Sequence, residues 1–210
     1  MHVLVTAGPT REYVDAVRFL SNASSGKLGF ACARAAAARG HRVTLVTGPV
    51  DLPVPPGIRV VRVGAAEEMR RAVLRSSPGA DAVIMTAAVG DYRPEHRTWR
   101  KLKKSDERMT LRLVRTRDIL AELGRRKRGQ ILVGFALEVQ RPVQNALRKM
   151  REKRLDLIVL NRPGSLGAER MSAVVFGREG ELRRFRAVEK RRLAQWLVRE
   201  VERRKDLGTA

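Results

Sequence analysis

The sequence has few aromatic residues, little cysteine and no long apolar run, and each shortage excludes a class of protein. The 210 residues include one cysteine, Cys32, so no intramolecular disulfide can form and a reducing compartment is expected. Cys32 lies among alanines of a predicted helix, where a buried thiol is a poor nucleophile. No apolar run can span a bilayer, and no signal peptide is recognisable, so we expect a cytoplasmic protein without a membrane partner.

Aromatic residues make up only 4% of the chain, whereas Lys and Arg outnumber Asp and Glu by 44 to 22 and give a net charge of +22. Such an excess suggests a basic nucleic-acid-binding protein, which we keep as one alternative. However, so few aromatics offer no evident stacking platform for single strands, and the basic residues are spread along the whole chain. An enzyme that acts on polyanions also accounts for the charge, and nucleic acid is not the expected partner.

Strand-like and helix-like segments alternate along the chain and predict the fold class. The expected strands are 3–7, 42–47, 58–63, 81–87, 131–135, 156–160 and 172–176, and the expected helices are about 27–39, 65–75, 142–153 and from about 188. This alternation predicts an α/β protein with a Rossmann-like, mostly parallel sheet and helices on both faces. Residues 1–210 should form a single domain.

The C-terminal helix is amphipathic. Leu193, Trp196, Leu197 and Val201 recur at helical spacing and should face the core, which leaves the many basic residues of this helix as a solvated face.

A segment between Tyr92 and Val114 departs from the alternation. Its two runs, KLKK and MTLRLV, alternate in character on either side of SDER, which is typical of a β-hairpin with a charged outer face. In such a hairpin Lys101 and Lys103 would point to one side and Lys104 to the other. A hairpin inserted after an interior strand cannot join a parallel sheet, so we expect a projecting flap at about 92–114 that reaches a partner subunit or covers a ligand.

A polar loop enters the first predicted helix through Ser24, Ser25, Gly26 and Lys27. Free backbone N–H groups, two hydroxyls and one ammonium converge there on a helix N-terminus, where phosphate is favoured. The order of strand, loop and helix therefore predicts a site for a phosphorylated ligand.

This loop matches known phosphate-binding motifs only in part. Residues 24–29 read S-x-G-x-x-G, but the second strand ends in Gly48 and Pro49 without the acidic residue that would hold a nicotinamide cofactor's ribose. Gly26-Lys27 is followed by Leu28, which does not fit a Walker A loop. An NAD(P)-dependent reductase remains an alternative that explains this loop alone.

A second cluster lies at the end of strand 81–87, where small residues are followed by an acidic one. Ala87, Ala88 and Asp91 occupy the carboxyl edge of a central strand, which is where open α/β sheets bind ligands.

Two lysines share a face of the predicted helix 142–153. Lys149 and Lys153 are four residues apart, and together with Lys27 and Lys101 they would suit a triphosphate.

Taken together, these blocks resemble the phosphopantothenoylcysteine synthetases, the phosphopantothenate–cysteine ligases of coenzyme A biosynthesis, over about residues 3–161. The matching blocks are TAGPTRE (6–12), VRFLSNASSGKLGFA (17–31), VTLVTGPV (43–50), AAVGDYRP (87–94), KLKK (101–104), RDIL (117–120), VGFALE (133–138) and LDLIVLN (155–161).

The resemblance implies a ligation in two steps. The carboxylate of 4′-phosphopantothenate attacks the α-phosphate of CTP and releases pyrophosphate, and the amine of cysteine then attacks the acyl-cytidylate and expels CMP. Magnesium would travel with the triphosphate, so no protein metal site is expected. The resemblance also implies a homodimer whose flap completes the neighbouring site, and a flavin-dependent decarboxylase that acts as a separate protein.

Site residues follow from the resemblance position by position. Lys101 resembles the flap lysine needed to form the acyl-nucleotide, and Asn22 the asparagine that holds it for the second step, with Arg18 and Ala87 in support. The positions that match nucleotide-binding residues are Gly8, Ser24, Gly26, Asp91, Arg117, Asp118, Ile119, Leu120, Phe135, Lys149 and Lys153.

Some positions depart from the pattern of the family. Gly90 replaces the alanine of AAVAD, and Thr116-Arg117 precedes Asp118 where bacterial members have Asn-Pro. The GFAAET block reads GFALEV in this chain. Because the altered loop contacts the nucleotide in the family, ATP remains an alternative to CTP.

Overall fold

A computed structural model describes residues 1–103, 107–162, 164 and 167–207. An eight-stranded sheet forms its centre, in the order β12-β11-β10-β9-β6-β1-β4-β5. The bounds of these strands are β1 His2–Ala7, β4 Arg42–Thr47, β5 Arg59–Arg62, β6 Ala82–Met85, β9 Ile131–Leu137, β10 Leu157–Asn161, β11 Arg170–Gly177 and β12 Gly180–Glu189.

The sheet is parallel from β5 to β10, and β11 and β12 add an antiparallel edge. From β1 the chain first moves outward to β4 and β5, and then returns to place β6 on the other side of β1. The direction of winding therefore reverses between β1 and β6, which opens a crevice at their carboxyl ends. The predicted α/β class with a mostly parallel sheet is confirmed.

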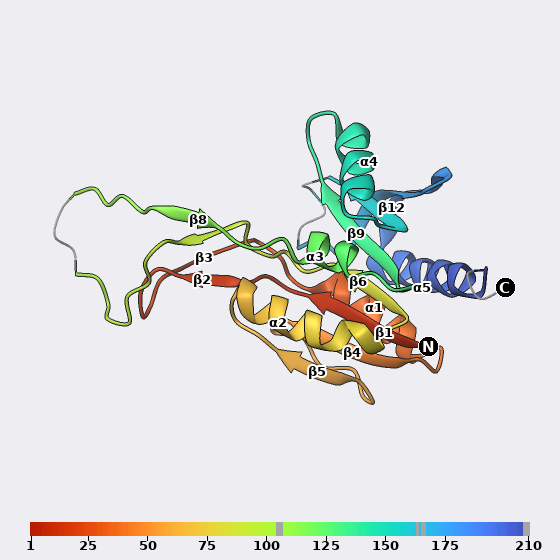
Figure 1. The fold of residues 1–210 in the computed structure, drawn as a ribbon, viewed down its shortest axis with the longest axis horizontal. Coiled ribbons are helices and arrows are strands. Elements are labelled where there is room, and N and C mark those ends of the chain that lie inside the picture. The colour runs from red at the N-terminus through yellow and green to blue at the C-terminus, as the bar shows by residue number, and fades with distance from the viewer. Residues whose placement is uncertain (104–106, 163, 165–166, 208–210) are drawn as a thin grey trace.

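Helices cover both faces of the sheet, as predicted (Figure 1). Helices α1 (Lys27–Ala37) and α5 (Lys190–Leu207) pack in one apolar cluster, and α2 (Ala66–Ser76), α3 (Ile119–Arg125) and α4 (Pro142–Glu152) in the other. Alternate residues of β1 supply the two clusters, with Val3 and Val5 facing α1 and α5 and Leu4 facing α2. A short 3₁₀ turn, η1 (Ser77–Gly79), follows α2.

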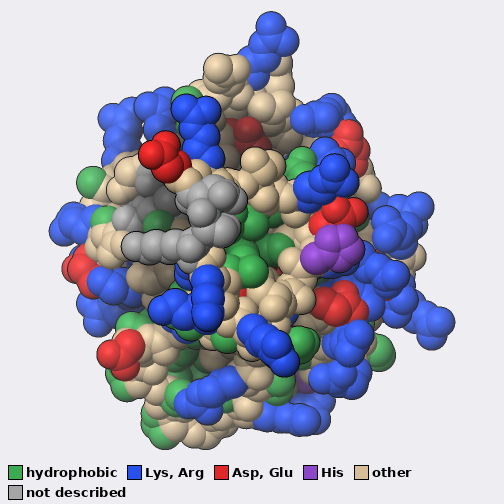
Figure 2. All heavy atoms as spheres, turned by 90° about the vertical axis from the view of Figure 1, so that its left-hand side faces the viewer, with side chains coloured by type: hydrophobic (Ala, Val, Ile, Leu, Met, Phe, Trp, Pro, Cys, Tyr) green, Lys and Arg blue, Asp and Glu red, His purple; other side chains and the backbone are tan. Residues whose placement is uncertain are grey.

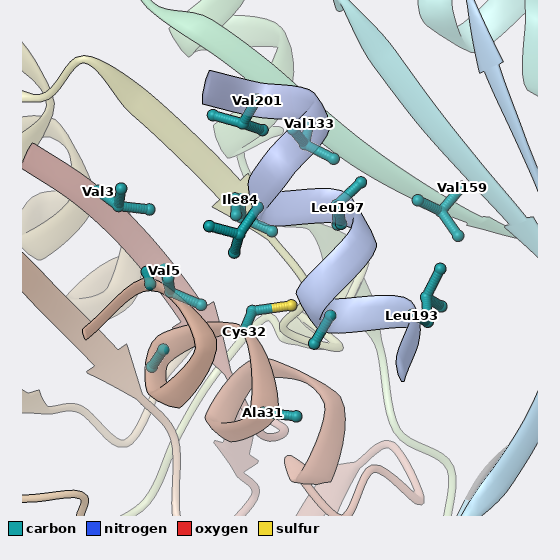
Figure 3. Packing of buried hydrophobic residues seen from close by; sticks show 14 of the residues in the cluster. Val3, Val5, Ala31, Cys32, Ile84, Val133, Val159, Leu193, Leu197 and Val201 are labelled. Carbon is teal, nitrogen blue, oxygen red and sulfur yellow. The ribbon is translucent and has the colours of Figure 1, made fainter. Parts of the chain in front are cut away.

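The packing of α1 against α5 confirms two expectations about the core (Figure 3). Cys32 is fully buried, and burial raises the pKa of its thiol to about 12, so it is not a nucleophile at neutral pH. Leu193, Leu197 and Val201 of α5 are buried as their spacing predicts, and Trp196 is half-buried with its ring against Phe185.

The C-terminal region differs from the prediction, because α5 begins at Lys190 and the preceding residues form β12. This strand lies at the edge of the sheet and carries many charged side chains, and Phe185 is its only buried residue among those described. Edge strands tolerate such charges because one of their sides is open to water, which weakens the apolar alternation that identifies a strand.

The predicted flap projects from the sheet (Figure 1). Two small antiparallel pairs build its base, β2 (Arg11–Tyr13) with β3 (Phe19–Ser21) and β7 (Tyr92–Pro94) with β8 (Leu113–Arg115). We call the flap and the β2–β3 hairpin together the arm. No strand of the arm belongs to the central sheet.

The predicted hairpin flap is confirmed, but its paired strands are β7 and β8, and β8 includes only the last two residues of the MTLRLV run. Residues 101–103 and 109–112 form no strand, although the Glu95 N–H still donates to the Arg112 carbonyl oxygen at 2.9 Å. Lys104 and the rest of 104–106 lie outside the described residues. An isolated two-stranded ribbon is marginal in water, and Leu102 and Leu111 remain exposed because no third strand or helix covers them.

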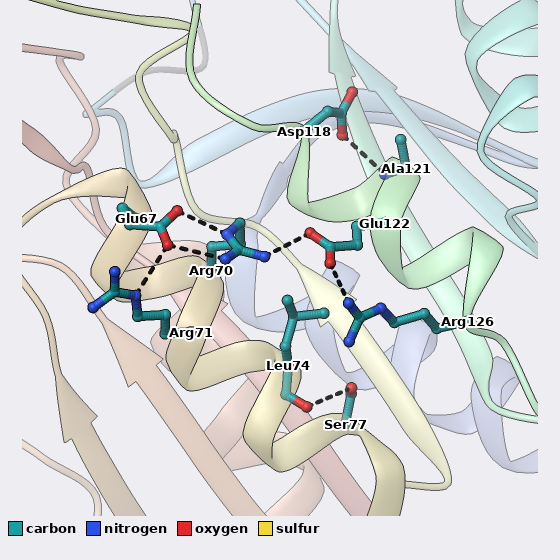
Figure 4. Close-up of polar contacts among 9 residues, drawn as sticks. All are labelled: Glu67, Arg70, Arg71, Leu74, Ser77, Asp118, Ala121, Glu122 and Arg126. Carbon is teal, nitrogen blue, oxygen red and sulfur yellow. Dashed lines mark hydrogen bonds and ion pairs between the residues drawn. The ribbon is translucent and has the colours of Figure 1, made fainter.

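Helices α2 and α3 are joined by a charged network that positions the loop before α3 (Figure 4). Arg70 donates to Glu67 at 2.7 Å and to Glu122 at 2.8 Å, and Glu122 also pairs with Arg126 at 2.6 Å. The hydrogen bonds from Arg70 and Arg71 hold the pKa of Glu67 at about 2. At the start of α3, Asp118 caps the helix by accepting the N–H of Ala121 at 2.9 Å.

Helix α1 approaches β1 and β6 through Gly29. A Cβ atom at this position would lie 2.5 Å from both the Cβ of Ala7 and the Oγ1 of Thr86. Only glycine therefore allows the first turn of α1 to lie against the ends of these strands.

We expect Gly29→Ala to lower the free energy of unfolding by about 1–3 kcal/mol, because the new methyl group must push α1 away from the sheet. Alanine is otherwise the better helix former, so a loss of stability measured by thermal or urea unfolding isolates the steric effect. Gly79→Ala is the matched control, because a Cβ there meets nothing within 4 Å. Equal stability of the two variants would contradict the close contact.

Candidate active site

A cavity of about 560 Å³ opens at the carboxyl ends of β6, β9 and β10, beside the point where the strand order reverses. This volume falls within the range of small-molecule binding sites. The predicted site residues that line it are Asn22, Ser24, Gly26, Ala87, Asp91, Arg117, Asp118, Ile119, Leu120, Phe135, Lys149 and Lys153. Three others, Gly8, Arg18 and Lys101, are not part of its lining.

One wall of the cavity is the N-terminus of α1. Ser24, Ser25 and Gly26 line it together with the first turn of the helix, whose N–H groups have no intrahelical acceptor. The first turn contains no acidic residue, so no carboxylate of α1 competes with a bound anion. The predicted phosphate loop therefore has the geometry of an anion site.

Gly8 packs against this loop. Gly8 and Gly26 both have a positive φ, of 73° and 74°, and a Cβ on Gly26 would come within 3.3 Å of the Gly8 nitrogen. Val50 packs against both glycines. Gly8 thus positions the loop and does not line the cavity.

Asn22 bridges the loop and the end of β6. Its side-chain amide donates to the carbonyl oxygens of Ala88 and Val89, both at 3.2 Å. The N–H of Ala87 is itself donated to the Thr6 hydroxyl at 3.1 Å, so in this arrangement Ala87 can offer a ligand only its carbonyl oxygen. Donation from Asn22 to a ligand requires the exchange of one of its two bonds.

The opposite wall carries the lysines of α4. Lys149 donates to the Phe135 carbonyl oxygen at 2.7 Å, and Lys153 pairs with Asp118 at 2.6 Å. Burial and the nearby charge of Lys153 lower the pKa of Lys149. Burial alone would raise the pKa of Asp118, but the hydrogen bonds from Lys153 and Ala121 outweigh it and lower that pKa. The predicted shared face of the two lysines is confirmed, and both reach the cavity.

An ion pair in the turn of the β2–β3 hairpin holds the flap. The Asp15 carboxylate is fully buried and accepts from Arg18 at 2.6 and 2.9 Å and from the N–H of Leu102 at 3.2 Å. Arg18 also donates to the Leu102 carbonyl oxygen at 2.9 Å. The hydrogen bonds from Arg18 hold the pKa of Asp15 far below its ordinary value. Arg18 therefore acts on the flap segment that carries Lys101.

Sequence reasoning missed two charged residues of this region. Asp15 stands three residues before Arg18, a spacing that signals a local ion pair. Lys190 lines the cavity from the start of α5, and it precedes Leu193 and Leu197 on the same helix face, so the helical periodicity already marked it as inward. The basic residues of this helix were expected on a solvated face, but Lys190 is buried.

Within the described residues, no group of three or more His, Cys, Asp or Glu side chains could hold a metal ion. The carboxylates that line the cavity are Asp91, Asp118 and Glu138, and Asp118 is already engaged by Lys153. Magnesium takes few protein ligands when phosphate oxygens supply the rest, so this set fits a metal that arrives with a nucleotide.

Lys and Arg side chains surround the face from which the arm projects, with Asp and Glu among them (Figure 2). These side chains do not form a single basic stripe on this face. A nucleic-acid groove would be expected to have such a stripe. Across the described part of the chain, no helix is both long and apolar enough to cross a membrane.

This chain is similar in sequence to one protein family and to two curated proteins, among others. Residues 1–204 match the family described as DNA/pantothenate metabolism flavoprotein C-terminal domain. The chain is 44% identical over 205 residues to the coenzyme A biosynthesis bifunctional protein CoaBC of Bacillus subtilis, covering 95% of this chain and 50% of that protein. It is 41% identical over 205 residues to a cysteine/cysteine sulfinic acid decarboxylase of an unknown prokaryotic organism, covering 57% of it. The chain thus spans about half the length of these curated relatives.

Two solved structures share the fold. The C-terminal domain of a coenzyme A biosynthesis bifunctional protein CoaBC superposes with a TM-score of 0.85 at 36% identity, covering 98% of this chain and 95% of that one. A Cab2 mutant in complex with phosphopantothenate-cysteine superposes with a TM-score of 0.80 at 15% identity, over 99% of this chain and 87% of that one, and shows the same fold.

We expect Asp15→Asn to free the flap, because the neutral amide cannot hold Arg18 and the Leu102 N–H as the carboxylate does. Limited trypsin digestion should then cleave at Lys101 and Lys103 several-fold faster than in the parent protein. Glu107→Gln, which removes an exposed carboxylate of the same flap, is the charge-matched control and should not change the rate. An unchanged rate in Asp15→Asn would show that the ion pair does not hold the flap.

Proposed function

Since the chain belongs to the family of the DNA/pantothenate metabolism flavoprotein C-terminal domain, we propose that it is a phosphopantothenate–cysteine ligase of coenzyme A biosynthesis. One observation carries this proposal. A single cavity combines the free N–H groups of α1, the amide of Asn22 and the lysine pair of α4, so it offers cationic groups on two walls to a phosphorylated substrate and a nucleotide. The names of the CoaBC relatives support the pathway.

In the first step, the carboxylate of 4′-phosphopantothenate attacks the α-phosphate of the nucleotide. An acyl–phosphate bond forms, and the bond to pyrophosphate breaks. Negative charge develops on the phosphate oxygens, and fixed cations stabilise it most where water is excluded. Lys149 and Lys153 hold the triphosphate in this scheme, and Lys101 neutralises the reacting phosphate.

In the second step, the amine of cysteine attacks the acyl carbon, loses a proton and expels the nucleoside monophosphate. The amide of Asn22 exchanges its bond to Ala88 or Val89 for one to the reacting carbonyl oxygen. The carbonyl oxygen of Ala87 orients the incoming amine.

We propose CTP as the nucleotide, with ATP as the alternative. Asp91, the loop from Arg117 to Leu120, and Phe135 form the part of the cavity assigned to the nucleotide. Arg117 replaces the proline of bacterial members, so the loop is held instead by the Asp118 cap and the ion pair between Asp118 and Lys153. Magnesium bound to the triphosphate would neutralise phosphate charge.

The active protein in this proposal is a homodimer in which each flap completes the neighbouring site. Lys101 lies on a flap that projects from its own subunit and is not part of the cavity lining (Figure 1). The arm also exposes apolar side chains that a second copy would cover, among them Trp99 with 76% of its surface exposed. The exposed apolar residues of the arm are Val17, Phe19, Leu20, Tyr92, Trp99, Leu102, Met109, Leu111 and Leu113.

The product, 4′-phosphopantothenoylcysteine, is a substrate for decarboxylation at its cysteine carboxylate. A flavin-dependent decarboxylase is therefore the partner that we propose for the next reaction. One relative is named a decarboxylase, and this chain matches only part of it. This supports a link between a domain of this family and decarboxylation.

Pyrophosphate release tests the proposed function directly. Purified protein is incubated with 4′-phosphopantothenate, cysteine and magnesium, with CTP in one series and ATP in another. Release that requires phosphopantothenate supports the ligase and identifies the nucleotide. If neither nucleotide gives release, the proposal fails and the reductase and nucleic-acid alternatives return.

We expect Asn22→Asp to release pyrophosphate but to form little ligated product, because a carboxylate cannot donate to the reacting carbonyl. The acyl-nucleotide should accumulate and be detectable by mass spectrometry after a rapid quench. Ser21→Ala controls for disturbance of the loop. Ser21 neighbours Asn22 in the chain, and its hydroxyl donates to the Thr10 carbonyl oxygen at 2.8 Å. A normal yield of ligated product from Asn22→Asp would remove Asn22 from the second step.

Mixing two inactive variants tests the shared site. Lys101→Gln and Asn22→Asp should each lack ligase activity alone, but a heterodimer contains one site with both native residues. Random reassociation of equal amounts should restore about a quarter of the parent activity, since half of the dimers are mixed and each has one intact site. If activity stays at the level of the separate variants while subunit exchange is demonstrated, Lys101 does not act across the dimer.

A further inference from the structure

Lys190 is a cation of the cavity that no step above uses. It is the first residue of α5 and lines the cavity from the face of the sheet that α1 and α5 cover. Lys149 of α4 and Lys153, which directly follows this helix, enter from the other face of the sheet. The cavity therefore has cationic groups on two separate sides.

Among the described residues, the Lys190 ammonium has no hydrogen-bond or ion-pair partner, although only 8% of the residue is exposed. Glu169, whose negative charge acts on Lys190, is instead paired with Lys27, which also lines the cavity. Burial and the positive charge of Lys27 lower the pKa of Lys190. Among the described residues no fully buried side-chain nitrogen or oxygen lacks a hydrogen-bond partner, so the Nζ atom of Lys190 reaches the solvent of the cavity. There the charge is only partly hydrated, and it is less favourable than a fully solvated ammonium.

The helix dipoles add to this cost. Lys190 stands at the N-terminus of α5, and the first turns of both α5 and α1 contain no acidic residue. Cations are disfavoured at helix N-termini, where anions are favoured. An anion placed between Lys190 and the first turn of α1 would relieve both unfavourable contacts.

The backbone holds Lys190 in this position. Its N–H donates to the Glu169 carbonyl oxygen at 3.1 Å, which ties the start of α5 to the segment before β11. Three residues earlier, Ala187 adopts a left-handed φ of 44° and donates its N–H to the Ser172 hydroxyl at 2.9 Å. The register between β11 and β12 shifts nearby, between Met171 and Ala173. Such irregularities redirect a strand and are frequent beside functional sites.

We propose that Lys190, together with Lys27 and the free N–H groups at the start of α1, forms a second phosphate subsite, separate from that of Lys149 and Lys153. The identity of its ligand rests on the proposed function. A ligase substrate set offers two sources of phosphate oxygens, the triphosphate end of the nucleotide and the phosphomonoester of 4′-phosphopantothenate. Binding at this subsite would fix one end of a substrate while Asn22 acts at the other.

The test uses the intact protein and inorganic pyrophosphate as the probe. Lys190→Met keeps most of the side-chain volume and removes the charge, so it should weaken pyrophosphate binding about tenfold or more in calorimetric titrations. Arg192→Gln removes one charge from an exposed position of the same helix turn and is the matched control. Lys190→Arg retains the charge and should keep most of the affinity.

Thermal unfolding separates binding from a structural role. Lys190→Met should unfold at the same or a higher temperature than the parent protein, since it relieves a buried charge. A lower unfolding temperature together with unchanged pyrophosphate affinity would overturn the proposal.

Steady-state kinetics then distinguish the two phosphate sources. A raised KM for the nucleotide assigns the subsite to the triphosphate, and a raised KM for phosphopantothenate assigns it to the phosphomonoester. If the parent protein releases no pyrophosphate but Lys190→Met still loses affinity for the probe, the proposed function fails and the subsite stands. Equal affinity of Lys190→Met and Arg192→Gln for the probe would remove the subsite.

Discussion

The close approach of α1 to the carboxyl ends of β1 and β6 is the contact on which the rest of the structure depends. Gly29 permits it, because any side chain there would collide with Ala7 and Thr86. The approach brings the free N–H groups of α1 to the point where the strand order reverses, and it lets Asn22 bond to the carbonyl oxygens of Ala88 and Val89. A helix displaced from the sheet would lose these bonds and the wall of the cavity together.

The buried lysines of the cavity lower the stability of the free protein. Burial lowers the pKa values of Lys149 and Lys190, which means that folding disfavours their charged forms. Lys27 and Lys153 are each paired with a carboxylate, Glu169 and Asp118, that a phosphate could replace. Because Lys149 and Lys190 have no carboxylate ion-pair partner among the described residues, an anionic ligand near them recovers part of the free energy that their burial cost.

The arm follows a different principle from the core. Its two hairpins are joined by the buried Asp15 carboxylate, Arg18 and the backbone of Leu102, whereas most of its apolar side chains face water. A surface of this kind gains stability only when another molecule covers it. This separation agrees with the proposal that the flap serves a neighbouring subunit.

The alternation of strands and helices along the chain could be predicted from the sequence, and the family resemblance identified part of the cavity lining. Strand and helix periods reflect burial within a few residues, so β1, α1 and α2 were recognisable, and the S-S-G-K loop indicated an anion site by its residue types. The edge strand β12 and the short α3 were missed because charges hide the period of the strand and the helix covers barely two turns.

The sequence by itself determined the local elements, the fold class and the chemistry of the phosphate loop. Only the tertiary structure decided which charges meet. Asp15 reaches Leu102, Lys27 pairs with Glu169, and Lys190 is left without a carboxylate partner among the described residues. These contacts join segments far apart in the chain, and their distances follow from how the sheet and helices pack, which no local pattern of residues specifies.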